Sequence, residues 1–115
     1  MTVSERAVGS VTLLDVEGQL ILGEGADRLR DKVRSLLQQD QKQLVVNLAG
    51  VPYMDSAGLG VLVQAFATTS KQGGALKLVN LTRRLQDLLV ITKLSTVFES
   101  FDSEAAALAS FAVPA

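Results

Sequence analysis

The spacing of apolar and polar residues predicts a sheet with helices packed on it. Two short strands are predicted at Val3 to Val8 and Val11 to Val16, because Gly9-Ser10 between them is typical of a tight hairpin turn. From Ala26 to Gln38 apolar residues recur every three or four positions, with charged residues on the other side of the helical wheel. Leu44 to Leu48, LVVNL, is apolar and rich in β-branched residues, which predicts a central strand covered by helices.

A strand, helix, strand unit follows the same rules. After a loop with Pro52, apolar residues at helical spacing predict a second helix: Leu59, Leu62, Val63 and Phe66. Gly73-Gly74 ends that helix before a strand from Ala75 to Val79. Asn80 or Thr82 is a suitable N-cap for a third helix, whose buried stripe is formed by leucines: Leu85, Leu88 and Leu89.

The last segment predicts one more strand and one more helix. The strand is expected at Val97 to Ser100, and the helix from about Ser103 to Ala112 with Asp102 or Ser103 as its cap. We therefore predict a single α/β domain over residues 1–115. Its mixed sheet of four to five strands is opened by an N-terminal hairpin, and its four helices lie mainly on one face.

The composition of the chain argues against several classes of function. Eleven basic against 12 acidic residues leave a net charge of −1, which speaks against direct nucleic-acid binding. The chain has no Cys and no His, which removes thiolate and imidazole metal ligands and Ser-His catalysis. No segment offers the roughly 20 apolar residues of a membrane span, so a cytoplasmic protein is expected. We expect no enzyme activity, cofactor or metal.

The candidate chemistry lies at Asp55-Ser56, between the predicted central strand and the second helix. Open α/β sheets place their sites at this carboxyl end of the strands. The unpaired N–H groups and the positive dipole of a helix start favour a capping hydroxyl or a phosphate. Ser56 is expected to cap the helix. Asp55 either has a functional use, in which it orients the hydroxyl or contacts a partner, or it caps the helix or turn, and the two uses are compatible.

Two enzyme motifs fail at this junction. A phosphate-binding loop would need Gly-Lys-Ser/Thr, yet no lysine follows Gly58 until Lys71. A nucleophile elbow would need glycine two residues before the serine, where Met54 stands, together with a histidine base.

The segment from Tyr53 to Leu62, YMDSAGLGVL, resembles the signature of STAS domains, and specifically of bacterial anti-sigma factor antagonists, which usually read Asp-Ser-Ser/Thr-Gly-Leu/Ile-Gly. Other segments resemble the family in the same order: Val16 to Leu20 (VEGQL), Gln72 to Leu78 (QGGALKL) and Leu89 to Leu94 (LVITKL). The resemblance covers nearly the whole chain.

The resemblance implies a regulator that exchanges partners. Such an antagonist binds an anti-sigma factor that is also a serine kinase and thereby frees the sigma factor. The kinase phosphorylates the antagonist, and a serine phosphatase reverses the reaction. On this sequence the resemblance places the phosphate on Ser56, and the partner contact on six consecutive residues: Asp55, Ser56, Ala57, Gly58, Leu59 and Gly60.

Two positions depart from the family pattern. Ala57 stands where many members have a second hydroxyl residue, and Ile21 stands where many carry Asp. The first departure keeps an alternative open, in which the chain is a STAS scaffold or an accessory subunit of a transporter or lipid-transport assembly and is not phosphorylated. The second removes any partner contact that an Asp at position 21 would make.

Overall fold

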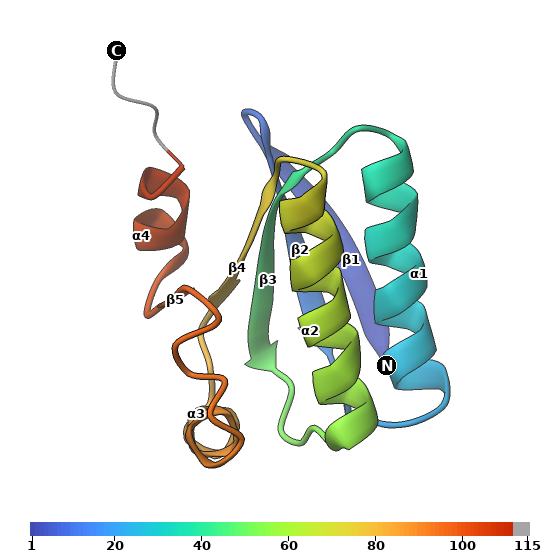
Figure 1. Cartoon of the computed structure of the whole chain (residues 1–115), viewed down its shortest axis with the longest axis vertical. Coiled ribbons are helices and arrows are strands. Elements are labelled where there is room, and N and C mark those ends of the chain that lie inside the picture. The colour runs from blue at the N-terminus through green and yellow to red at the C-terminus, as the bar shows by residue number, and fades with distance from the viewer. Residues whose placement is uncertain (112–115) are drawn as a thin grey trace.

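The computed structural model describes residues 1–111, which form one five-stranded sheet with helices on both faces (Figure 1). The strands are β1 (Thr2–Val8), β2 (Val11–Glu17), β3 (Gln43–Gly50), β4 (Ala75–Val79) and β5 (Ser100–Phe101). They lie in the order β1-β2-β3-β4-β5, with β1 antiparallel to β2 and each later neighbour parallel. The predicted N-terminal hairpin and the predicted central strand are thus confirmed.

The described helices are α1 (Glu24–Gln38), α2 (Ser56–Lys71), α3 (Arg83–Ile91) and α4 (Glu104–Ala109). Figure 1 shows α1 and α2 side by side on one face of the sheet and α4 on the other. Apolar side chains of α1, α2 and α3 form one core with the sheet, as Leu29, Leu62 and Leu85 show. The prediction that the helices lie mainly on one face is confirmed, because α4 alone of the four helices within residues 1–111 packs on the opposite face. None of the helices between residues 1 and 111 is long and apolar enough to cross a membrane.

The opposite face has a smaller core and one buried cation. Ala107 of α4 packs with Leu13 and Val45 of the sheet. Beside them Lys77 is only 7% exposed, and its Nζ donates to Ser110 Oγ at 2.8 Å and lies 4.4 Å from the centre of the Phe111 ring. A buried charge needs such partners, so Lys77 holds the end of α4 on the sheet.

The end of the chain differs from the prediction. The last strand is Ser100–Phe101 rather than Val97 to Ser100, because the Val97 N–H donates to the Leu94 carbonyl at 3.0 Å in a turn. Phe98 is instead buried in the main core, where its ring meets the Phe66 ring edge-on at 5.3 Å. The strand β5 has two residues, Ser100 and Phe101, which pair with Leu78 and Val79 of β4.

The last helix is also shorter than predicted. It ends at Ala109, and Ala112 lies outside the described residues. Of the alternative caps, Ser103 is used for α4 and Thr82 for α3. Asn80 adopts a left-handed conformation with φ 59°, and its side-chain amide donates to Asn47 Oδ1 at 3.2 Å.

Candidate functional site

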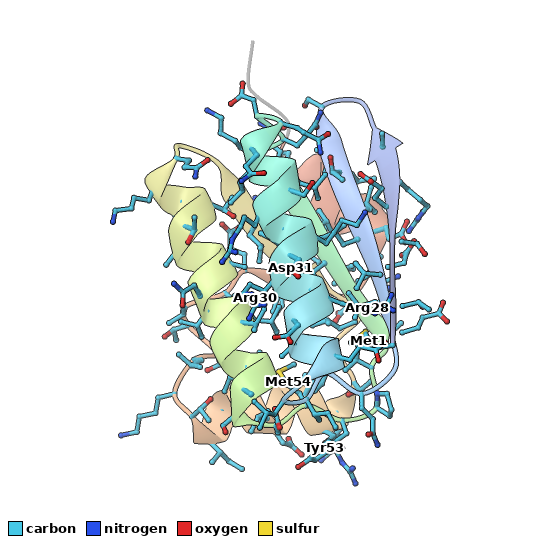
Figure 2. All side chains as sticks on the ribbon, turned by 90° about the vertical axis from the view of Figure 1, so that its right-hand side faces the viewer. Met1, Arg28, Arg30, Asp31, Tyr53 and Met54 are labelled. Atoms are coloured by element: carbon cyan, nitrogen blue, oxygen red, sulfur yellow. The ribbon has the colours of Figure 1, made fainter. Side chains whose placement is uncertain are left out.

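The loop between β3 and α2 lies against the segment that joins β2 to α1. Both loops follow the carboxyl ends of neighbouring parallel strands. The Leu20 N–H donates to the Tyr53 carbonyl at 3.0 Å, and the Asp55 N–H donates to the Leu20 carbonyl at 3.3 Å. Figure 2 shows Tyr53 and Met54 at the end of the molecule where α1 and α2 begin. The buried side chain of Met54 anchors this loop in the core.

Asp55 is the N-cap of α2 and also joins the two loops. Its Oδ1 accepts the Gly58 N–H at 2.9 Å, and its Oδ2 accepts the Leu22 N–H at 3.0 Å. These hydrogen bonds, first that of Leu22 and then that of Gly58, hold the pKa of the Asp55 carboxyl below its ordinary value. The capping use of Asp55 is therefore present, together with a link to Leu22 for which the sequence gives no local signal.

The prediction that Ser56 caps the helix is wrong. Asp55 has the extended backbone of an N-cap, with φ −98° and ψ −175°, and Ser56 is the first helical residue. The Ser56 side chain is exposed, and within residues 1–111 its hydroxyl has no hydrogen-bond partner. Because the adjacent carboxylate already occupies the helix end, the hydroxyl remains open to an incoming group.

The six residues of the predicted contact differ in exposure. Ser56 and Gly60 are exposed, Asp55 and Ala57 are half-buried, and Gly58 and Leu59 are buried. A Cβ at Gly58 would overlap the Leu20 carbonyl oxygen, whereas a Cβ at Gly60 would meet nothing within 4 Å. Gly58 therefore serves the close packing of the two loops, and Gly60 leaves an open position on the surface of α2.

A shallow groove of about 560 Å³ starts at Ser56 and follows α2. Its lining residues come from α2 and from the segment after α3: Ser56, Leu59, Gly60, Val63, Gln64, Ala67 and Leu94. None of these described residues is charged. Leu94 is not among the residues predicted for the site, although it ends one of the segments that resemble the family. The groove offers a mainly apolar surface next to the serine.

The other side of the site is formed by Ile21 and Leu22. The Ile21 carbonyl accepts the Ala26 N–H at 3.0 Å in the first turn of α1. The Leu22 side chain is 77% exposed, although its backbone is held by Asp55. Sequence reasoning missed Leu22, because an isolated apolar residue in a loop carries no pattern.

We expect Asp55→Asn to keep the hydrogen bond that caps α2 and to remove the one that joins Asp55 to Leu22. The amide oxygen of Asn can still accept the Gly58 N–H, since Asn is as good an N-cap as Asp. Its amide nitrogen cannot accept the Leu22 N–H, which leaves that donor without its acceptor. Hydrogen exchange should therefore become faster at Leu22 and change little at Gly58. Equal acceleration at both amides would contradict this division.

Asp55→Asn should also reduce the loss of folding stability at low pH. Because the folded pKa of Asp55 is lowered, its contribution to stability is fully present above the ordinary carboxyl pKa and is lost as the pH falls through the folded value. Urea unfolding at about pH 6 and about pH 3, on either side of the ordinary value, measures the effect. The variant should lose less stability on acidification than the wild type, and identical losses would contradict the role of the charge.

The family model and the curated relatives that match this chain point to the same family. A family model described as "STAS domain" matches residues 3–107. The anti-sigma-B factor antagonist of Bacillus subtilis (strain 168) is 46% identical over 71 residues, which are 62% of this chain and 64% of that protein. That of Listeria monocytogenes is 45% identical over 56 residues, 49% of each chain. The chain thus spans less than two thirds of the length of these curated relatives.

Solved structures share the fold. The Bacillus cell fate determinant SpoIIAA in its phosphorylated form has a TM-score of 0.76 at 16% identity, covering 96% of this chain and 100% of that one. A sulfate transporter family protein from Wolinella succinogenes has a TM-score of 0.78 at 23% identity, covering 91% of this chain and 87% of that one. At these identities the likeness shows the arrangement of strands and helices.

Proposed function

The chain belongs to the STAS domain family, and we propose that it is an anti-sigma factor antagonist that is switched by phosphorylation of Ser56. In its unphosphorylated form it binds a kinase-type anti-sigma factor, and the bound sigma factor is released. The observation that carries the proposal is the exposed Ser56 hydroxyl, which has no hydrogen-bond partner in the described part of the chain and lies at the start of an apolar groove. The antagonists of Bacillus and Listeria are the curated relatives that support it.

The contact surface consists of the start of α2 and the groove beside it. A partner that covers Leu59, Val63 and Leu94 removes apolar surface from water, while Ser56 is brought to the ATP of the kinase. The Ser56 oxygen then forms a bond to the γ-phosphorus, the bond from that phosphorus to ADP breaks, and the serine proton passes to a base of the kinase. The structural relative SpoIIAA exists in a phosphorylated form. A serine phosphatase resets the switch.

The phosphate ends binding through charge. It adds about −1.5 to −2 charge directly beside the Asp55 carboxylate, whose oxygens already hold the nearest amides. Covering this pair of negative groups with an apolar partner surface requires their desolvation, which is costly without a new cation. Release therefore needs no change of fold.

A second candidate is a STAS module that acts as a scaffold in a transporter or lipid-transport assembly. Two observations favour it: Ala57 removes the second hydroxyl of the signature, and the Wolinella structure of the same fold belongs to a sulfate transporter family protein. Co-purification with a transporter subunit in place of a kinase would support this role.

Intact-mass spectrometry tests the main proposal. The protein and its Ser56→Ala variant are incubated with ATP and a kinase-type anti-sigma factor from the same genome. We expect one phosphate on the wild type and none on the variant. A phosphate on both proteins would place the acceptor elsewhere, and binding without any phosphate transfer would replace the switch with an unswitched antagonist.

A further inference from the structure

Resting on the proposed function, we propose that Leu22 is an apolar anchor for the anti-sigma factor. Its side chain enters an apolar socket on the partner, beside the place where Ser56 meets the kinase. The role is not part of the signature, because Leu22 lies 34 positions before Ser56 in the chain.

The structure places Leu22 at the site. Its backbone N–H donates to Asp55 Oδ2 at 3.0 Å, and Ser56 follows Asp55 directly. Leu22 and Ser56 therefore flank the same carboxylate, so that a partner reaching the serine also covers the loop that carries the leucine. The apolar groove starts at Ser56 and continues along α2, and Leu22 adds a separate exposed apolar side chain next to the Asp55 carboxylate.

The loop that presents Leu22 is held on both sides. Before it, Leu20 is fixed to the neighbouring loop by two backbone hydrogen bonds. After it, Gly23 has φ 102°, and its carbonyl accepts the Asp27 N–H at 2.9 Å as α1 begins. Because the backbone around Leu22 is already fixed, binding has to order only its side chain, which is 77% exposed. Leu22 is therefore suited to be an anchor.

The chemistry of the loop selects an apolar partner surface. Ile21 and Leu22 themselves carry no charge, whereas Asp55 and Glu24 next to them are acidic. Burial of an exposed leucine is favourable in proportion to the apolar area removed from water. A partner with an apolar socket gains this contribution, and one with a charged surface loses the solvation of its charge.

Binding of the unphosphorylated protein to its anti-sigma factor tests the inference. Leu22→Ala is expected to raise Kd about 30-fold, and Leu22→Asp more. In phosphorylation assays both should raise KM while kcat changes little, because the reacting groups are intact. Since the side chain is exposed, both variants should keep the thermal unfolding midpoint of the wild type.

Two other exposed apolar residues serve as controls. Val8 is 45% exposed in the hairpin at the amino end of β2, away from the site, and Val8→Ala should leave Kd within about twofold, the usual result of truncating a residue outside the contact. Ile91 is 78% exposed at the end of α3. If Ile91→Ala weakens binding and Leu22→Ala does not, the anchor lies elsewhere and the inference is overturned.

Different results would overturn the proposed function and the role of Leu22. Loss of binding in Ser56→Glu together with unchanged binding in Leu22→Ala would overturn the role of Leu22 and leave the antagonist intact. Absence of saturable binding to any kinase-type anti-sigma factor by the wild type would overturn both.

Discussion

Gly58→Ala is expected to destabilise the protein by about 3 kcal/mol or more, at the upper end of overpacking effects. The added Cβ would overlap the Leu20 carbonyl oxygen and lie 2.9 Å from Leu20 Cγ. Leu20 cannot withdraw easily, because its N–H and its carbonyl are both hydrogen-bonded to the loop before α2. Urea unfolding measures the decrease in the free energy of unfolding. The amides at the start of α2 should also lose protection from hydrogen exchange.

Gly60→Ala is the matched control on the same helix. Its Cβ would meet nothing within 4 Å, and Gly60 lies inside α2. Alanine should therefore stabilise the helix by about 0.4–1 kcal/mol, mainly by restricting the unfolded chain. The two substitutions are chemically identical and are expected to differ in sign. Similar losses at both positions would mean that the close packing of Leu20 on Gly58 is not what fixes the loop.

The sheet and its helices could be predicted from periodicity. The central position of LVVNL follows from its mainly apolar, β-branched composition, which indicates cover on both faces, and β3 is indeed the middle strand. Helix positions followed from apolar spacing in the same way. The two-residue strand β5 could not be located, because Val97 and Phe98 favour a strand locally while the turn at Leu94 and the burial of Phe98 decide their conformation.

The site was located by sequence, but its internal geometry was not. Asp and Ser are both common N-caps, and the choice of Asp55 depends on which residue faces Leu20 when α2 packs on the neighbouring loop. The hydrogen bond from Leu22 joins residues that are 33 positions apart in the chain, so no local sequence pattern predicts it. The two glycines of the signature look alike in sequence, and the structure assigns close packing to Gly58 and an open surface to Gly60.

Ser56→Glu is expected to weaken binding to the anti-sigma factor about 100-fold, which corresponds to about 2.7 kcal/mol. The added carboxylate would lie beside Asp55 at the mouth of an uncharged groove, and the partner would have to desolvate both charges. Ser56→Ala should bind nearly as well as the wild type, because the hydroxyl has no partner within residues 1–111 that its removal would leave unpaired. Isothermal titration with the same anti-sigma factor measures both affinities.

Ser70→Glu distinguishes a local effect of charge from a general one. Ser70 is exposed near the other end of α2, and this variant carries the same net charge as Ser56→Glu. The two positions are about 20 Å apart along the helix, since each residue advances about 1.5 Å. At physiological salt that distance exceeds the range of unscreened interaction between exposed charges, so Ser70→Glu should bind like the wild type. Equal weakening by both variants would mean that the partner responds to overall charge, and the position of Ser56 beside Asp55 would then have no special part in release.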